Sequence, residues 1–111
     1  MTIVTFGKHN GMIVSVECKG HTGWGEQGED IVCAALSSMV QSCALGILQV
    51  VKIDAEYTTD EESGYLKLVL PQELTDSQSH DASVLLDTLL MSVQDLSESY
   101  HQYVKSEVKR L

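Results

Sequence analysis

A cysteine and a histidine stand at the two ends of a glycine-rich segment near the start of this chain. His21 and Cys33 are twelve residues apart, and Gly23, Gly25 and Gly28 lie between them. An imidazole beside a thiol can take the thiol proton and later return it to a leaving group, which is the basis of nucleophilic cysteine chemistry. The glycines lack a Cβ atom, so the backbone can approach a ligand closely. This spacing makes Cys33 a candidate nucleophile and His21 a candidate base.

Asp30 and the apolar run that follows it predict the start of a helix, with Asp30 as its N-cap. Cys33 then falls near the third position of the first turn, where unpaired amides and the helix dipole stabilise a thiolate. The same amides can donate hydrogen bonds to a developing oxyanion. Ser37 lies one turn later and can support the site by a hydrogen bond, although a serine within a helix is commonly packed or bonded to its own backbone. Asp30 either only caps the helix or also orients His21.

The remaining cysteines and the histidines indicate neither a disulfide framework nor a metal site. Cys18 falls in a strand pattern and Cys43 deep in an apolar helix, and both are interpreted as core residues. Three cysteines are an odd number without a CxxC pair, and in a reducing compartment they stay thiols. The four histidines are scattered without the spacing of zinc ligands, so we expect no metal and no cofactor. Cys33 also has an ordinary explanation as a packed residue, because buried cysteine behaves as a small hydrophobe.

The segment around Cys33 resembles the signature of the ribosomal-processing cysteine protease family. That signature is a Gly-His pair, a glycine-containing loop, and the run Gly-x-Asp-Ile-Val-Cys-Ala at the start of a helix. The matching residues are Gly20, His21, Gly25, Glu26, Gly28, Asp30, Ile31, Val32, Cys33 and Ala34. The resemblance extends over essentially the whole chain. It implies a cysteine endopeptidase that removes a short N-terminal extension from the precursor of large-subunit ribosomal protein twenty-seven, with Cys33 as nucleophile and His21 as catalytic histidine.

The segment from Thr22 to Glu29 is expected to be a substrate loop that closes over a bound peptide as a lid. Its glycines are candidate hinges for that movement. Trp24 either covers an apolar side chain of the substrate or is an exposed loop aromatic, and here the chain departs from the polar residues commoner in the family. The family's substrate is apolar and aromatic at the cut, which implies an apolar groove beside Cys33.

Length and composition predict one globular domain over residues 1–111. Hydrophobic residues make up 43% of the chain and charged residues 21%, with a single proline. The first residues lack the pattern of a signal peptide, and the longest apolar stretch, around Ala44 to Val51, is short for a membrane span. We therefore expect a cytoplasmic protein that does not bind a membrane. The net charge of −9 disfavours direct binding of nucleic acid and suits a basic protein partner.

The periodicity predicts six elements in the order ββαββα. They are strands over residues 2–7 and 12–20, a helix over 30–51, strands over 52–59 and 64–70, and a helix over 79–109. Asn10 and Gly11 form the turn of the first hairpin, since both tolerate positive φ. The second strand ends at Gly20 and so delivers His21 to the loop. The acidic turn at residues 60–64 is interpreted as a solvated loop.

This order predicts an α+β fold, a two-layer sandwich in which an antiparallel sheet carries two helices on one face. The first helix has few charges on any side, so we expect it to be buried all round. Four short strands cannot cover that much apolar surface, which predicts a homodimer, as the resemblance also implies.

Two rival functions stay open. One is a non-catalytic ribosome-associated binding protein with an acidic surface, in which Cys33 is only packed. The other is a thiol redox or acyl-transfer enzyme, although no second cysteine lies close to Cys33 in the sequence to resolve a disulfide.

Overall fold

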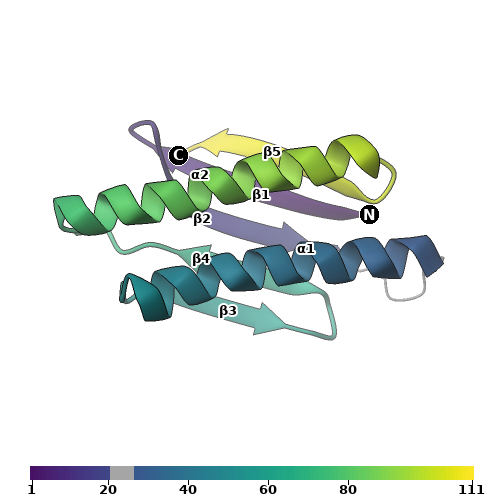
Figure 1. The fold of residues 1–111 in the computed structure, drawn as a ribbon, viewed down its shortest axis with the longest axis horizontal. Coiled ribbons are helices and arrows are strands. Elements are labelled where there is room, and N and C mark those ends of the chain that lie inside the picture. The colour runs from purple at the N-terminus through teal and green to yellow at the C-terminus, as the bar shows by residue number, and fades with distance from the viewer. Residues whose placement is uncertain (21–26) are drawn as a thin grey trace.

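A computed structural model of the chain describes residues 1–20 and 31–111, together with the helical backbone of residues 27–30. Figure 1 shows how the elements in this part of the chain are arranged. In chain order they are β1 (Thr2–His9), β2 (Met12–Lys19), α1 (Gln27–Leu45), the π-helical segment η1 (Gly46–Val50), β3 (Glu56–Asp60), β4 (Tyr65–Val69), α2 (Asp76–Ser99) and β5 (Val104–Arg110).

The strands form one sheet in the order β3-β4-β2-β1-β5. Neighbouring strands are antiparallel except β1 and β5, which pair in parallel with Thr2 opposite Val104. At the turn between β1 and β2, Asn10 and Gly11 have φ angles of 53° and 80°, as a tight hairpin turn requires. The predicted α+β class and the order ββαββα are confirmed. β5 follows as a further strand, and its parallel pairing makes the sheet mixed rather than antiparallel.

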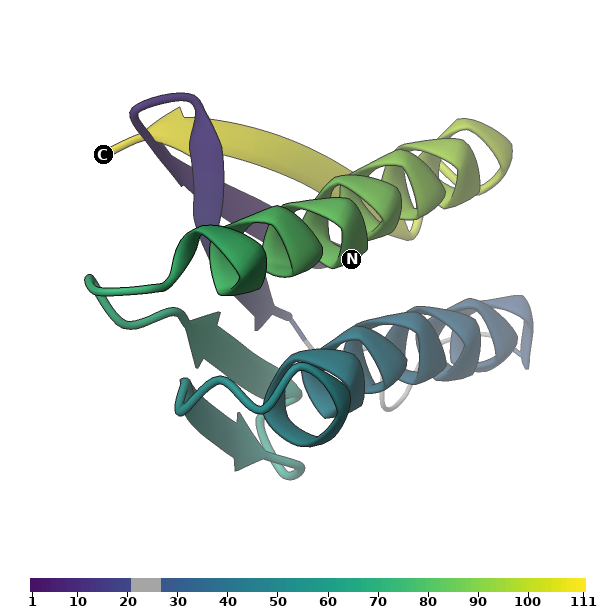
Figure 2. The same ribbon diagram turned by 60° about the vertical axis from the view of Figure 1, so that its left-hand side comes forward.

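Both helices cover the same face of the sheet and run antiparallel, side by side, so the domain has two layers (Figures 1 and 2). The core lies between these layers and is lined by strand residues at alternate positions, as strand geometry dictates. The inward-facing residues of the three central strands include Val4, Phe6, Val16, Cys18, Leu66 and Leu68, all of them buried. Val32, Leu36 and Val40 of α1 and Leu86, Leu89 and Val93 of α2 fill the other side of this core.

The first helix differs from its prediction at both ends. α1 begins at Gln27, so Asp30 lies inside the helix and the prediction that it is the N-cap was wrong. An aspartate is favourable in the first turn as well as at the cap, because both positions meet the positive end of the helix dipole, and its presence alone does not fix the first residue. At the other end the helical path widens into η1, where Val51 N–H donates to the Gly46 carbonyl at 2.9 Å.

The second helix is shorter than predicted. α2 begins after Thr75, whose side chain accepts from the Gln78 N–H at 3.1 Å while the Gln78 side chain accepts from the Thr75 N–H at 3.0 Å. It ends at Ser99, and the basic residues at 105, 109 and 110 lie on β5 instead of stabilising a helix C-terminus. The strand forms here because the outer edge of β1 offers backbone partners to residues 104–110.

One side of α1 faces away from the core. The segment Ile31–Val50 has a mean hydropathy of 1.9 and is long and apolar enough, by composition, to cross a membrane. Its buried residues pack on the sheet, and the core helix of a compact domain can have the same high mean hydropathy for that reason. Only 33% of the apolar window is buried, and Ile31 and Leu45 are exposed by 67% and 60%. Within one chain, therefore, the helix is not buried all round.

Candidate active site

Cys33 lies on α1 beside a hollow of about 320 Å³. Three parts of the fold enclose it: the N-terminal half of α1, the neighbouring ends of β1 and β2, and the hairpin formed by β3 and β4. Cys33 is half-buried, so its thiol is partly covered by neighbours while the residue faces open space. A hollow of this size suits part of a peptide side chain and the backbone around it.

A hydroxyl lies next to this thiol. Thr2, the first residue of β1, places Oγ1 3.7 Å from Cys33 Sγ, and either atom can be the donor. Thr2 is 4% exposed, and it lines the hollow together with Cys33. Ser37, one turn after Cys33 on α1, also lines the hollow, as the helical spacing predicts. The thiol therefore has hydroxyl side chains of two different elements in its surroundings.

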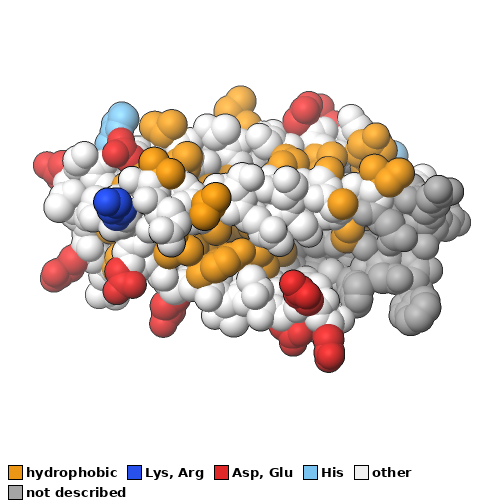
Figure 3. Space-filling view, turned by 60° about the horizontal axis from the view of Figure 1, so that its bottom comes forward, with side chains coloured by type: hydrophobic (Ala, Val, Ile, Leu, Met, Phe, Trp, Pro, Cys, Tyr) orange, Lys and Arg blue, Asp and Glu red, His pale blue; other side chains and the backbone are white. Residues whose placement is uncertain are grey.

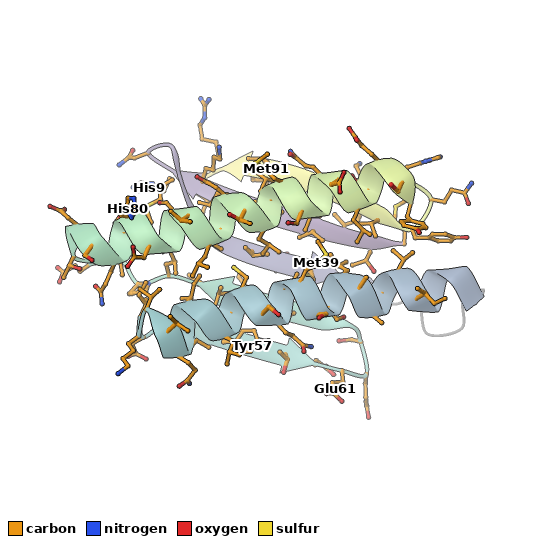
Figure 4. All side chains as sticks on the ribbon, viewed as in Figure 1. His9, Met39, Tyr57, Glu61, His80 and Met91 are labelled. Carbon is orange, nitrogen blue, oxygen red and sulfur yellow. The ribbon has the colours of Figure 1, made fainter. Side chains whose placement is uncertain are left out.

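The walls of the hollow are apolar towards the core and acidic at the rim. Leu36 and Val40 of α1 and Leu66 of β4 form the apolar part, consistent with the apolar groove expected beside Cys33. Asp60 and Glu61 line the opposite side, and Figure 4 shows Glu61 at the turn between β3 and β4. Among the described lining residues there is no lysine, arginine or histidine. The local charge is thus negative, which favours a cationic ligand group.

The acidic turn is held in a defined shape by its own backbone and by the sheet. Asp60 Oδ1 accepts from the Glu62 N–H at 3.1 Å. Tyr65 of β4 lies on the wall of the hollow, and its hydroxyl donates a hydrogen bond to Oε2 of Glu17 on β2 at 2.7 Å. This hydrogen bond, more than the nearby lysine ammonium groups, lowers the pKa of Glu17, and the same bond raises the pKa of Tyr65. The hairpin wall is therefore tied to β2 by a charge-assisted hydrogen bond.

The other two cysteines have the settings predicted for core residues. Cys18 is 7% exposed and Cys43 is 8% exposed. Burial raises the pKa of the Cys18 thiol to about 12, with a further contribution from the Glu17 charge, and raises that of Cys43 to about 11. A neutral buried thiol is a poor nucleophile, because the thiolate is the attacking species. Neither residue is thus equipped for the chemistry proposed for Cys33.

The structure brings some of the predicted site residues together and leaves others undescribed. Cys33, Ser37 and Gly20 all line the hollow. The predicted base and part of the substrate loop lie outside the described residues: these are His21, Gly23, Trp24, Gly25 and Glu26. Gly28 and Asp30 lie in the first turns of α1, where only the backbone is described. No group of three or more histidine, cysteine, aspartate or glutamate side chains within the described ranges could hold a metal ion.

The earlier start of α1 changes the surroundings of the thiol. Cys33 is the seventh residue of the helix, beyond the four N-terminal amides that lack helical partners. Its own N–H is therefore not one of the unpaired donors, and the first-turn amides belong to residues nearer Gln27.

Thr2 and the acidic rim were not predicted as site residues. A hydroxyl at an inward position between apolar neighbours would have been the signal for Thr2, whereas nothing local distinguishes Asp60 from any solvated turn residue.

Gly20 has a conformation that only glycine adopts readily. Its φ is +111°, and a Cβ atom there would overlap the carbonyl oxygen of Met1 and lie 3.2 Å from the Cα of Thr2. The end of β2 thus packs directly on the first residues of β1. Thr2 lies at the edge of the hollow beside this contact, and a side chain at position 20 would displace the first residues of β1.

Comparisons with known proteins agree with this geometry. The family model of the cysteine protease Prp matches residues 1–105. A Staphylococcus aureus relative named ribosomal processing cysteine protease Prp is 26% identical over 99 residues, covering 89% of this chain and 90% of the relative. A Bacillus subtilis relative of the same name is 24% identical over 92 residues, covering 83% of this chain and 82% of the relative.

Solved structures share the fold over nearly the full length. A Streptococcus mutans protein superposes with a TM-score of 0.89 and 28% identity, covering all of this chain and 96% of the other. The S. aureus Prp protease with a covalently linked product peptide superposes with a TM-score of 0.82 and 25% identity, over 98% of this chain and 100% of the other. With the family model matching nearly the whole chain, this protein belongs to the cysteine protease Prp family and is a cysteine protease.

Proposed function

We propose that this protein is a cytoplasmic cysteine endopeptidase that removes a short N-terminal extension from large-subunit ribosomal protein twenty-seven. The single observation that carries the proposal is the position of Cys33, which is half-buried and lines the hollow. Cys18 lines the same hollow, but Cys18 and Cys43 are buried and burial raises their pKa values to about 12 and about 11. The matched relatives are named ribosomal processing proteases, which supports a ribosomal protein as substrate. Reduced thiols in the cytoplasm suit this chemistry.

The reaction we propose begins with proton transfer from Cys33 Sγ to the imidazole of His21. The thiolate attacks the carbonyl carbon of the peptide bond, so a C–S bond forms and the carbonyl oxygen becomes an oxyanion. When the C–N bond breaks, His21 gives its proton to the departing amine. A water molecule then attacks the thioester, releasing the acid and restoring the thiol. His21 follows Gly20 directly in the chain, and Gly20 lines the hollow, which supports this pairing.

The walls of the hollow support the proposed substrate class. Leu36, Val40 and Leu66 can accommodate an apolar side chain at the cut. Asp60 and Glu61 at the rim favour a basic segment nearby, as does the net charge of −9. Ribosomal proteins are strongly basic, so long-range attraction would also speed the encounter. A non-catalytic binding protein could use the same acidic surface, and the two functions differ in whether the nucleophile is needed.

The proposal is tested with purified protein and a peptide that contains the extended N-terminus of ribosomal protein twenty-seven. We expect one cut, abolished by Cys33→Ala and by His21→Ala, with strongly non-additive losses in the double variant because both residues serve one step. Cys43→Ala is the matched control on the same helix and should keep the cut. Cys33→Ala should still bind the peptide. A Cys33→Ala protein that cleaves would overturn the mechanism, and wild-type binding without any cleavage would favour the binding protein.

We also propose that two copies associate through the outer faces of their helices. Ile31 and Leu45 on α1 and Val84 and Met91 on α2 are between 53% and 70% exposed, and Figure 4 marks Met91 on α2. Hydrophobic side chains are also spread along the face seen in Figure 3, where most of the charge in view is acidic. Covering such a surface favours a symmetric dimer. Sedimentation at tens of micromolar, roughly the range for a standard interface, should show a dimer; a monomer would contradict it.

A further inference from the structure

Thr2 is an unusual residue at its position in the sheet. Inward-facing positions of β1 alternate as Thr2, Val4 and Phe6, and the last two are fully buried apolar residues. Thr2 itself is 4% exposed and is the one polar residue classed as buried in the described part of the chain. A buried hydroxyl costs stability unless it is hydrogen-bonded, whereas a valine of nearly the same shape would not carry that cost. We therefore expect the hydroxyl of Thr2 to make a hydrogen bond that matters for function.

The hydrogen-bond partner of this hydroxyl is the sulfur of Cys33. Thr2 Oγ1 lies 3.7 Å from Cys33 Sγ, although the two residues are 31 positions apart in the chain. A neutral thiol and a hydroxyl can each donate to the other. After the thiol loses its proton, only the hydroxyl can donate, and a hydrogen bond to a charged acceptor is stronger than one between neutral groups. The contact is thus expected to stabilise the thiolate more than the thiol.

We propose that Thr2 contacts the nucleophile as a hydrogen-bond donor and assists transfer of the Cys33 proton to the base by stabilising the thiolate as it forms. The inference rests on Cys33 being the nucleophile, as proposed above. The thiol proton goes to the base, Thr2 keeps its own proton throughout, and the hydrogen bond weakens as the new C–S bond removes charge from sulfur. Thr2 therefore assists formation of the nucleophile rather than the later steps.

The backbone holds this hydroxyl in place from two sides. Thr2 N–H donates to the carbonyl of Tyr103 at 2.8 Å, and Thr2 is paired with Val104 of β5. On the other side Gly20 packs so closely on Met1 and Thr2 that no Cβ atom fits. A donor fixed by the fold needs no reorganisation when charge appears on sulfur, which is where such donors have their largest effect.

The test measures iodoacetamide alkylation of Cys33 against pH, with the labelled cysteine identified by mass mapping. Thr2→Val removes the hydroxyl and keeps the shape, so the rate at neutral pH should fall about tenfold. The difference should close near about pH 10, where an ordinary thiol is fully ionised. Thr2→Ser keeps the hydroxyl and should keep the rate. Thr5→Val, on the opposite face of the same strand, is the matched control and should leave the rate unchanged.

Thermal unfolding separates this role from a merely structural one. Thr2→Val should be as stable as the wild type or more stable, while Thr2→Ser should be less stable because it loses a methyl group. Stability and reactivity would then change in opposite directions. An unchanged rate in Thr2→Val, or a loss that is equal at all pH values, would overturn the inference. If Thr2→Val does not fold, Thr2→Ala and Thr2→Ser form a second pair, and equal rates in these two would overturn it. Alkylation needs no peptide, so this outcome is independent of whether the proposed substrate is cut.

Discussion

The two halves of α1 carry one cysteine each and place these thiols in opposite surroundings. In the N-terminal half, Cys33 is half-buried and faces the hollow beneath the β3–β4 hairpin. In the C-terminal half, Cys43 is buried, and its Sγ donates to the carbonyl of Leu85 in α2 at 3.6 Å. Both cysteines have mainly apolar neighbours in the sequence of the helix, so local composition does not create the difference. The neighbours do: one thiol adjoins open space and hydroxyl groups, the other a close contact between two helices.

A similar contrast appears in two glycines, one that follows α1 and one that follows β2. Gly46 lies where the helices approach closely, and a Cβ there would be 3.1 Å from Leu85 Cδ1. Gly20 lies at the hollow, and its positive φ and its close backbone neighbour both exclude a residue with a side chain. A small residue thus permits close helix packing at Gly46 and close packing of β2 on β1 beside the site at Gly20.

Thiol labelling tests the contrast between Cys33 and the buried cysteines, and it is the prediction with the largest expected effect. At pH 8 a Cys43 pKa of about 11 leaves about one thiol in a thousand ionised, and a Cys18 pKa of about 12 leaves fewer still. Iodoacetamide should therefore label Cys33 first in the folded protein, with Cys18 and Cys43 slower by orders of magnitude. In denaturant all three should react at similar rates. Mass mapping that finds Cys18 or Cys43 labelled first would contradict the assignment of the site.

Alanine at each glycine tests the second contrast. Gly20→Ala places a side chain at positive φ against the Met1 carbonyl, so we expect a loss of at least about 2 kcal/mol in unfolding free energy and slower alkylation of Cys33. Gly46→Ala meets only the end of a flexible leucine and gains helix propensity, so its effect should stay within about 1 kcal/mol. Denaturant titration measures both changes. Equal losses in the two variants would show that the two glycines do not differ in this respect.

Acid titration addresses the wall of the hollow. Folding lowers the Glu17 pKa below its ordinary value of 4.5, chiefly through the Tyr65 hydrogen bond, so the stabilisation is complete above pH 4.5 and is lost as the pH falls through the lowered value. Tyr65→Phe should therefore lower the melting temperature at pH 7, and its difference from the wild type should shrink in acid. Thr58→Val, on the neighbouring strand opposite Lys67, is a control for a lost surface hydroxyl. A difference that stays constant from pH 7 to acid would contradict this assignment.

The acidic rim should have the smallest effect. Asp60→Asn and Glu61→Gln each remove one charge from the hollow, and we expect kcat/KM for a lysine-containing peptide to fall about threefold at low salt. The loss should largely disappear at high salt, where exposed charges are screened. Glu62→Gln is the matched control, because it removes a charge from the same turn but does not line the hollow. An equal loss in all three variants would indicate a general effect of net charge.

Much of the fold was predictable because the local patterns were strong. The Asn10-Gly11 turn needs two residues at positive φ, and the strands on either side of it pair as predicted. The β3–β4 hairpin and both helices were also predicted, with errors mainly at their ends. Residues 104–109 were assigned to a helix because Tyr100, Tyr103 and Val104 also fit helical spacing. Their strand depends on the edge of β1, a partner about a hundred residues away that no local pattern reveals.

For the candidate site, too, the sequence determined some features and the packing of distant elements determined others. The sequence by itself determined which residue types could do the chemistry: a thiol, a histidine and a serine at fixed spacing around a glycine-rich segment, and with them the family resemblance that the comparisons support. Only the tertiary structure decided that Thr2 meets Cys33 and that the acidic turn lies on the wall of the hollow. Spacing along a chain constrains contacts within one helix or hairpin. Contacts between β1, α1 and the β3–β4 hairpin arise from packing, which brings together residues that are distant in sequence.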